Sequence, residues 1–338
     1  MKGMKVTKQK KKKKSAYIAV LFSVILLIII LIISADVDNN IINPSLACQD
    51  TTNKATEKAF LASFGLFDDV SNLMWERISK RYHENSIYKY PSDPLRNIQD
   101  EQKWLNENLI PNFPCPNVER VGKGEGVKYI CYPDRIIRKK QEPERKKKFD
   151  KVGDKLEADC LVYSIGCAGD FSFEYALAEK YDKRCEIHVF DPANWERKED
   201  VEKKNIHYHA WGMKSSYDFE SKSIVWPKGR RGGFKTFEET LDLLGHHNRT
   251  IDLFKIDCEG CEWSTYKDWL KFGFRQILME THGVPQPQGG NGRWYKKPMD
   301  VTQFYRDFDE HGYALFSTDQ NGLGMEMSYI KLDKELIY

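Results

Sequence analysis

Acidic residues and one histidine end three strand-like stretches of this 338-residue chain. Asp191 ends the apolar run 187–190, Asp257 and Glu259 follow the run 251–256, and Glu280 and His282 end the run 276–282. Carboxylates and imidazoles are side chains that act as general bases and bind metal ions. Because the carboxyl ends of strands in an open α/β sheet meet at one ligand-binding edge, we expect these residues to lie near a common site.

The elements that would position them begin with residues 161–192. An apolar, β-branched run ends in Gly166, a short turn contains Gly169, a helical pattern follows, and a second apolar run ends in Asp191. This order is typical of sites for nucleoside-like cofactors, in which glycines allow close approach and the acid binds two ribose hydroxyls. The alternative interpretation is an α/β unit in which the glycines only turn the chain and Asp191 caps a helix.

The glycine spacing indicates which cofactor is expected. A dinucleotide site would contain GxGxxG, but the three positions are Gly166, Ala168 and Phe171, so only the first matches. Phe171 in the first turn of the helix argues against a pyrophosphate seated there. S-adenosylmethionine carries no phosphate and needs only the close turn and the ribose acid, so the sequence favours it over NAD.

Six segments together resemble a known family. In chain order they are VYSIGCAGDFSFE, HVFDP, HYHAWGM, KTFEETLDLL, DLFKIDCEGCEW and ILMETH. They are similar to the FkbM-type and methyltransferase-like-24-type S-adenosylmethionine-dependent methyltransferases, over about residues 100–335, and the segment 115–131 resembles the second type most. The resemblance implies an α/β, Rossmann-like, seven-stranded methyltransferase sheet with helices on both faces.

The same resemblance implies roles for particular residues. Asp257 and Glu259 would lie near the reacting centre. The cofactor-binding residues would be Gly166 and Gly169 at the methionine end, Asp191 at the ribose, and Ala210 and Trp211 near the adenine. The turn departs from the family pattern because it has no third glycine.

Methyl transfer to a hydroxyl requires alignment of nucleophile, methyl and sulfur, and a base for the hydroxyl proton. The candidate catalytic residues are Asp257, Glu259, Glu280 and His282. An alternative mechanism uses a divalent metal, Mg²⁺ or Mn²⁺, held by Asp257, Glu280 and His282. A purely structural interpretation of Glu280 and His282 is a buried pair that orients loops.

The amino terminus predicts a membrane anchor. Eight lysines in the first 14 residues precede residues 16–35, an uncharged apolar stretch long enough to span a bilayer, and Asp36 and Asp38 follow it. The positive-inside rule places residues 1–15 in the cytosol and the remainder in the lumen of the endoplasmic reticulum or Golgi. A cleaved signal peptide ending near Ala35 is the alternative. A nucleic-acid partner for the lysines is not expected, because a membrane span follows directly.

The chain divides into five predicted parts: a tail (1–15), a membrane helix (16–35), a stem or linker (36–95), an amino-terminal extension of the catalytic domain (96–155) and a methyltransferase domain (156–338). In the last part we predict strands at 161–166, 186–191, 205–211, 251–257 and 276–282, helices at 171–181, 263–271 and 300–311, and a closing hairpin of 314–319 with 327–332.

The eight cysteines fit an oxidising compartment. Cys115 and Cys131 flank a glycine-rich turn as a hairpin clamp would, and we predict Cys160–Cys185 because these residues precede two neighbouring parallel strands. Cys258 and Cys261 are predicted to form a local disulfide or to remain two thiols. The spacing fits no structural zinc site. His188, His207 and His209 are expected to face solvent or loops. The only sequon begins at Asn248.

These observations favour an S-adenosylmethionine-dependent methyltransferase that O-methylates a glycan or another small hydroxyl-bearing acceptor in the secretory pathway. One alternative is a catalytically inactive, methyltransferase-like binding module. The other is a luminal glycosyltransferase, which shares the single-anchor layout. Its common DxD metal motif does not follow any predicted core strand: one DxD, residues 36–38, lies beside the predicted span, and the other, residues 307–309, lies within the predicted helix 300–311.

Overall fold

The computed structural model describes residues 58–85, 107, 109–137, 159–193, 195, 203–216, 233–282, 301–321 and 324–337. The chain separates into two units, Met1–Ala55 and Thr56–Tyr338, and all described residues belong to the second. The predicted tail and membrane helix therefore lie outside the described residues. Within the described part, no helix combines the length and the apolar character needed to cross a bilayer.

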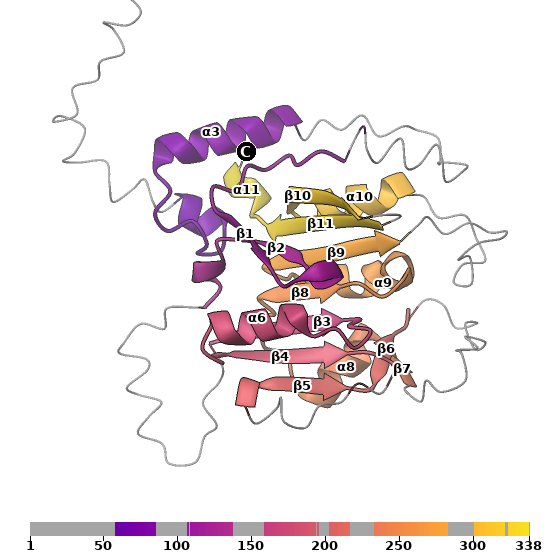
Figure 1. Cartoon of the computed structure of the whole chain (residues 1–338). Helices are drawn as coiled ribbons and strands as arrows, with labels where there is room; N and C mark the ends of the chain where they lie inside the picture. Colours follow the sequence, from indigo (N-terminus) through magenta and orange to yellow (C-terminus); the bar gives the residue numbers. More distant parts are fainter. Residues whose placement is uncertain are drawn as a thin grey trace, which may run out of the picture. The chain divides into compact units, whose positions relative to one another are not determined.

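A seven-stranded sheet forms the centre of the domain, in the order β10-β11-β9-β8-β3-β4-β5 (Figure 1). Neighbouring strands from β9 to β5 are parallel, and β11 is antiparallel to both β9 and β10. The strands are β3 (Cys160–Ile165), β4 (Cys185–Phe190), β5 (Ile206–His209), β8 (Leu253–Ile256), β9 (Gln276–His282), β10 (Tyr313–Asn321) and β11 (Gly324–Lys331). The predicted seven-stranded α/β sheet with its closing hairpin is confirmed.

Helices cover both faces of this sheet, which explains why the central strands β3, β4 and β8 are mostly apolar and almost entirely buried. On one face Val162 of β3 belongs to the same core as Leu177 of α6. On the other face Tyr163 belongs to the same core as Phe237 of α8 and Trp269 of α9. The helices are α3 (Asn72–Asn85), α6 (Ser172–Lys180), α8 (Phe237–Leu244), α9 (Cys261–Trp269), α10 (Val301–Glu310) and α11 (Lys334–Ile337), with 3₁₀ turns η1 (Gly124–Gly126), η2 (Pro133–Arg135) and η3 (Leu270–Phe272).

Two small sheets accompany the main one. An antiparallel hairpin of β1 (Val118–Val121) and β2 (Lys128–Cys131) packs near α6 and β9, and the Cys115–Cys131 disulfide clamps its base (Figure 1). The second pair, β6 (Trp211–Met213) with parallel β7 (Gly233–Lys235), was not predicted. The predicted strand 205–211 is consequently two strands, because β5 ends at His209 and the chain begins β6 at Trp211.

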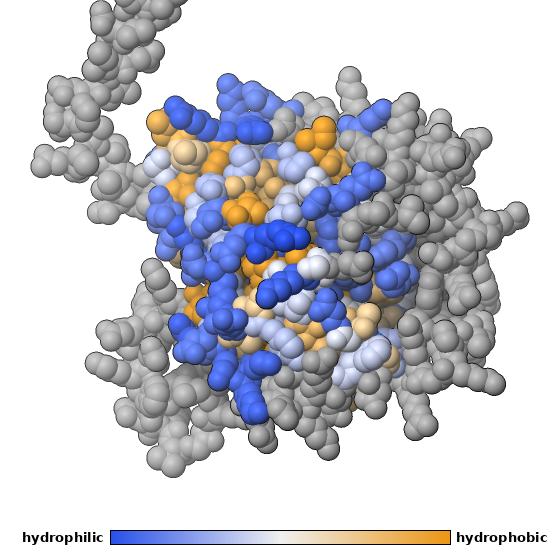
Figure 2. Space-filling view, in the orientation of Figure 1, coloured by the Kyte–Doolittle hydropathy of each residue, from blue (hydrophilic) through white to orange (hydrophobic). Residues whose placement is uncertain are grey.

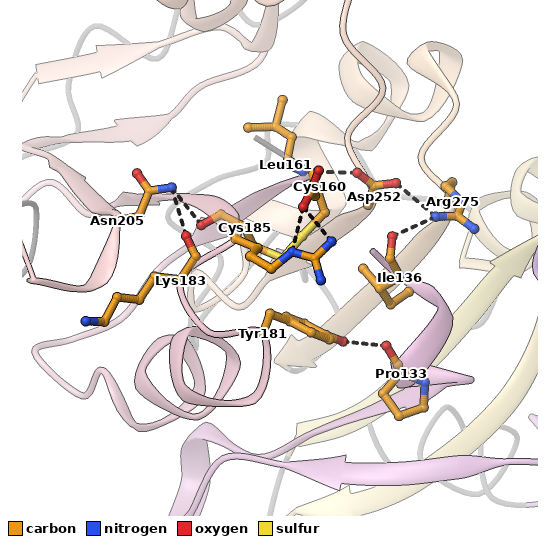
Figure 3. Close-up of a disulfide and its surroundings, with 12 residues drawn as sticks. Pro133, Ile136, Cys160, Leu161, Tyr181, Lys183, Cys185, Asn205, Asp252 and Arg275 are labelled. Carbon is orange, nitrogen blue, oxygen red and sulfur yellow. Dashed lines mark hydrogen bonds and ion pairs between the residues drawn. A yellow bond between two sulfur atoms is a disulfide. The ribbon is translucent and has the colours of Figure 1, made fainter. Parts of the chain in front are cut away.

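The disulfide Cys160–Cys185 joins the first residues of β3 and β4, as predicted (Figure 3). Beside it the carboxylate of Asp252 accepts hydrogen bonds from the Leu161 N–H (3.0 Å) and from Arg275 Nη1 (3.0 Å). Arg275 Nη1 also donates to the Ile136 carbonyl (3.1 Å), so the end of the amino-terminal extension is attached to the sheet. The third disulfide is Cys258–Cys261, which resolves the predicted alternative in favour of a local bridge.

The predicted stem is wrong for residues 58–85. Phe67 and Trp75 are buried, and Tyr82 donates a hydrogen bond to Asp309 beside the carboxyl end of α10. The sequence of this segment contains enough aromatic residues, at helical spacing, to bury one face against the core. Hydrophobic side chains of this segment also reach the surface, since Phe60, Leu61 and Phe64 are exposed. Figure 2 shows hydrophobic patches among the hydrophilic residues of the face in view.

The histidines of β4 and β5 also differ from the expectation that they face solvent or loops. His188 is buried, and His207 and His209 are half-buried. They lie on the face of the sheet that α8 covers, and their rings stack on one another, with centroids 4.9 Å apart for His188–His207 and 5.1 Å for His188–His209. Alternation along a strand identifies one face but does not reveal whether a helix covers it.

Candidate active site

The glycine turn after β3 lies against the end of β8. Gly166 has a φ of +78°, and a Cβ at this position would overlap the carbonyl oxygen of Asp257. Gly169 has a φ of +86°, and its Cβ would lie 3.0 Å from the ring of Trp195. Both positions therefore require glycine, because the backbone is left-handed and a neighbour is close. Lys255 on β8 donates to the Gly166 carbonyl and adds a second link between the two strand ends.

Asp191 lies at the end of β4, where it was predicted, and holds this turn. Its Oδ2 accepts hydrogen bonds from the N–H groups of Cys167 (3.2 Å) and Ala168 (2.9 Å), and its Oδ1 accepts one from Ala193 (2.8 Å). The residue is only 6% exposed. The carboxylate therefore orders the glycine turn, and its predicted contact with a ribose would have to use the remaining lone pairs.

Ala210 connects β5 to β6, and Trp211 is the first residue of β6. Ala210 is exposed, and the Trp211 ring packs at a tilt against His209 with ring centroids 4.6 Å apart. The Trp211 Nε1 is buried and has no hydrogen-bond partner among the described residues. The Asp191 N–H donates to the His209 carbonyl (3.1 Å), so these residues share the edge that carries the predicted ribose acid. Their predicted role near an adenine remains a prediction.

The predicted catalytic acids converge around a lysine that the sequence did not reveal. Lys128 of β2 has a fully buried side chain, and its Nζ lies 2.5 Å from Glu326 Oε1, 3.4 Å from Asp257 Oδ2 and 3.7 Å from Glu280 Oε2. Glu326 of β11 is directly opposite Glu280 of β9. His282 Nε2 is 3.4 Å from Glu280 Oε1. The end of the sheet thus contains three carboxyls, one ammonium and one imidazole.

The charges in this cluster follow from burial and proximity. Burial opposes the ammonium, but the charges of Asp257 and Glu326 raise the pKa of Lys128 above its usual value. Burial likewise opposes the imidazolium, while the hydrogen bond to Glu280 and the nearby acids raise the pKa of His282 to about 9. Burial favours the neutral form of both facing glutamates. The two pKa values therefore differ. Burial raises the pKa of Glu326, whereas hydrogen bonds from His282 and Glu326 lower the pKa of Glu280.

Glu259 lies apart from the cluster. Its side chain is 79% exposed and its Oε1 is 4.0 Å from His282 Nε2. The loop that carries it is closed by the Cys258–Cys261 disulfide and by the fully buried Glu262, which accepts hydrogen bonds from the N–H groups of Cys258 (2.5 Å) and Gly260 (2.8 Å). Burial raises the pKa of Glu262 to about 7. This loop fixes the backbone directly after Asp257.

Four residues of this region were missed from the sequence: Lys128, Lys255, Glu262 and Glu326. Lys255 lies within an otherwise apolar strand, IDLFKI, and a charge in such a run is a signal that could have identified it. Glu326 lies in GMEMSYI, where the same signal exists. Lys128 carries no such signal, because its hairpin sequence fits an exposed strand equally well.

The alternative metal site can be tested against the same geometry. The ligand atoms of Asp257, Glu280 and His282 lie within 4.8 Å of one another. His282 Nδ1 is buried without a hydrogen-bond partner among the described residues. Two carboxylates and an imidazole fit Mn²⁺ or Mg²⁺. The ammonium of Lys128 already lies beside both carboxylates, so a metal would have to share them with this cation.

Comparisons with known proteins identify the class. A family model described as a methyltransferase domain matches residues 57–331. Among solved structures, a SAM-dependent methyltransferase from Aquifex aeolicus is 12% identical and aligns over 56% of this chain and 89% of its own, with a TM-score of 0.27. The N-terminal domain of EvdMO1, solved with SAH and D-fucose, is 11% identical over 71% of this chain and 98% of its own, with a TM-score of 0.28.

Structural likeness at these scores carries no argument about the chain, so the class rests on the family match. No curated protein matches the sequence. The predicted methyltransferase class is confirmed, whereas the finer FkbM-type or methyltransferase-like-24-type resemblance stays a prediction.

Proposed function

Since the chain belongs to the family of methyltransferase domains, we propose that it is an S-adenosylmethionine-dependent O-methyltransferase. The cofactor would lie over the glycine turn between β3 and α6, and the acceptor hydroxyl would enter above Asp257 and Glu280. The observation that carries this proposal is the contact between the two halves of the site, which are the glycine turn after β3 and the end of β8 at Asp257. Gly166 packs against the Asp257 carbonyl, and Lys255 donates to the Gly166 carbonyl.

A methyl acceptor in this position would have its proton removed by a carboxylate. When bound, S-adenosylmethionine supplies an electrophilic methyl group; the new bond is carbon–oxygen, the bond broken is carbon–sulfur, and the hydroxyl proton passes to the base. With a pKa of about 9, His282 is protonated at neutral pH and cannot accept that proton. Its imidazolium instead orients Glu280. Asp257, 19% exposed at the strand end, and Glu280 are therefore the candidate bases.

A metal-assisted mechanism is the second candidate, and the cluster of Asp257, Glu280 and His282 supports it. In that case the three residues would bind the ion and Lys128 would balance the remaining carboxylate charge. Loss of transfer after chelation, with recovery on addition of Mn²⁺ or Mg²⁺, would favour this mechanism over a lysine-supported carboxylate base.

We also propose a luminal location with a single amino-terminal anchor, and a glycan or another small hydroxyl-bearing acceptor. The lysine-rich residues 1–15 and the apolar residues 16–35 support the anchor. Three disulfides support an oxidising compartment. Asn248 of the sequon is exposed, as an attached glycan requires. The FkbM-type resemblance of the six sequence segments supports O-methylation.

A catalytically inactive binding module is the remaining alternative. It is favoured by one observation, the use of the Asp191 carboxylate to hold three backbone N–H groups of its own turn. The glycosyltransferase alternative finds no support, because the family match is to a methyltransferase domain.

The test is calorimetric titration of the full-length chain in a mild detergent with S-adenosylmethionine and S-adenosylhomocysteine, followed by transfer of a labelled methyl group to oligosaccharides. Asp257→Asn should keep cofactor binding and lose transfer. Asp242→Asn, which removes an exposed carboxylate of α8, is the matched control and should keep both. Asp191→Ala is a poor probe, because it removes the acceptor of three turn N–H groups.

Each outcome separates the alternatives. Binding with transfer to oligosaccharides supports the proposed function. Binding without transfer to any hydroxyl acceptor supports the inactive module. A folded chain that binds neither S-adenosylmethionine nor S-adenosylhomocysteine contradicts the proposal that the protein is a methyltransferase.

A further inference from the structure

A second cluster of chemically active side chains lies on the sheet face that α8 covers, toward the amino ends of the strands. Glu186 and His188 belong to β4, and His246 follows the carboxyl end of α8. Glu186 precedes Asp191 by five residues, which is about 16 Å along a strand. The cluster is therefore separate from the candidate active site. We name it the His–Glu cluster, and it consists of Glu186, His188 and His246.

The three side chains converge on one point. Glu186 Oε1 lies 2.8 Å from His188 Nε2 and 3.8 Å from His246 Nε2. One ligand atom from each residue lies within 4.8 Å of the other two. Both histidines are buried, at 4% and 6% exposure, and Glu186 is half-buried with 23% of its side chain exposed. An ion could therefore approach along the carboxylate.

The outer nitrogens of both imidazoles are held by the protein. His188 Nδ1 is 2.8 Å from His209 Nε2, and His246 Nδ1 is 2.7 Å from the Tyr163 hydroxyl. Metal-binding histidines are usually fixed in this way, with one nitrogen hydrogen-bonded by a neighbour so that the other faces the ion. Here the nitrogens left over are the two Nε2 atoms that face Glu186.

Arg249 occupies the cation position in the described structure. Its Nη1 lies 2.7 Å from Glu186 Oε2 and 3.1 Å from His246 Nε2. Because a guanidinium only donates, this contact indicates that His246 Nε2 is unprotonated and carries a lone pair, as a metal ligand needs; Arg249 occupies that lone pair until it moves. Arg249 is 18% exposed and lies in the connection after α8. It can move outward without disturbing a strand.

We propose that the His–Glu cluster binds one divalent zinc-type ion through Glu186, His188 and His246, with Arg249 as the competing cation. Two imidazoles and one carboxylate suit Zn²⁺, and a water would complete a four-coordinate site. Such an ion would attach the connection after α8 to β4. The proposal does not depend on the methyltransferase function.

The experiment uses the full-length chain, stripped with EDTA and titrated with Zn²⁺ alone in competition with a chromophoric chelator. Wild type should bind one ion and gain thermal stability from it. His246→Gln should lose this ion, and His247→Gln, which alters the exposed neighbouring histidine, should not. Tyr163→Phe should weaken binding by about 10- to 100-fold through loss of an outer partner. Arg249→Met should tighten binding by about tenfold or more, because it removes a positive charge beside the ion.

Two further variants keep the result decisive. His282→Gln removes the imidazole of the candidate active site and should leave zinc binding intact; loss of binding in this variant would place the ion at that site and overturn the proposal. Absence of zinc binding by wild type, or binding that His246→Gln does not change, would also overturn it. His188→Gln removes the other imidazole ligand and should lose the ion as His246→Gln does. If His188→Gln fails to fold, His246→Gln and Arg249→Met still decide the question.

Discussion

Lys128 is expected to be the residue on which the stability of the active-site end depends most. Lys128→Met removes the ammonium that lies within 3.7 Å of the carboxyls of Asp257, Glu280 and Glu326, and leaves Lys255, whose Nζ is 3.8 Å from Asp257 Oδ2. At the distances of Asp257 (3.4 Å) and Glu280 (3.7 Å), and at an effective dielectric constant of about 20, each ionised carboxylate interacts with the ammonium by roughly 4–5 kcal/mol. Part of this lost interaction energy is offset, because the variant no longer has to bury a charged lysine side chain. Breaking a buried ion pair from one side costs about 3–5 kcal/mol, and we expect a loss of this size at pH 7.

The pH dependence follows from the signs of the pKa changes. The charge of Lys128 lowers the pKa of both Glu280 and Glu326. In Lys128→Met both pKa values therefore rise, and ionisation of these two glutamates destabilises the fold more as pH rises. The deficit of Lys128→Met should therefore be smaller at pH 5 than at pH 7. Adding Asp257→Asn should recover part of it, which a double-mutant cycle measures.

The assay is urea unfolding of the purified chain with disulfides intact, compared at equal m value. Lys180→Met is the matched control, because Lys180 also contacts two carboxylates, Glu119 (2.9 Å) and Asp134 (3.2 Å), but at the surface. Pairs of this kind contribute about 0–1 kcal/mol. Equal losses for the two variants, or a Lys128→Met deficit that does not shrink at pH 5, would refute the reasoning.

Three further predictions concern the same end of the sheet. Gly166→Ala should lower the free energy of unfolding by about 3 kcal/mol or more in urea and should abolish cofactor binding, because its Cβ meets a backbone carbonyl at positive φ. His282 has a pKa of about 9 against 6.5 when unfolded, so it contributes about 3 kcal/mol below pH 6.5 that is lost as pH rises through 9; His282→Gln should remove this pH-dependent difference in denaturant titrations. Replacing Cys258 and Cys261 by serine should lower the free energy of unfolding by about 2 kcal/mol or less, because the disulfide closes only a short loop and Glu262 still holds that loop. The same change should reduce methyl transfer more than it reduces stability.

The sheet could be predicted from the sequence because its signals are local. Apolar runs identify parallel strands buried on both faces, and three of the seven main strands, β4, β8 and β9, were placed from apolar runs that end in acids. The Cys160–Cys185 bridge followed from the same topology, since neighbouring parallel strands start at the same edge. The pair β6–β7 escaped, because each strand has only three residues and the two are distant in sequence.

The site was predictable only in part, for a physical reason. Asp257, Glu280 and His282 end strands, so topology alone brings them together. Glu326 and Lys128 reach them from within strands whose pairing depends on long-range packing, and no local pattern reveals that. The role of Asp191 differs for a similar reason: its position was predictable, but its backbone partners depend on how the glycine turn folds.

The ammonium of Lys128 gives the amino-terminal extension a role in the site. Its hairpin, β1–β2, is not part of the seven-stranded sheet, yet it supplies the cation for three carboxyls at the catalytic edge. A domain cut at residue 156 would keep every predicted catalytic residue and lose that cation. Without that cation the pKa of Glu280 would rise, and a protonated glutamate cannot act as a base. Asp257 would keep only Lys255, whose Nζ lies 3.8 Å from its Oδ2. We therefore expect the proposed methyl transfer to require the amino-terminal extension, which lies within the family match that begins at residue 57.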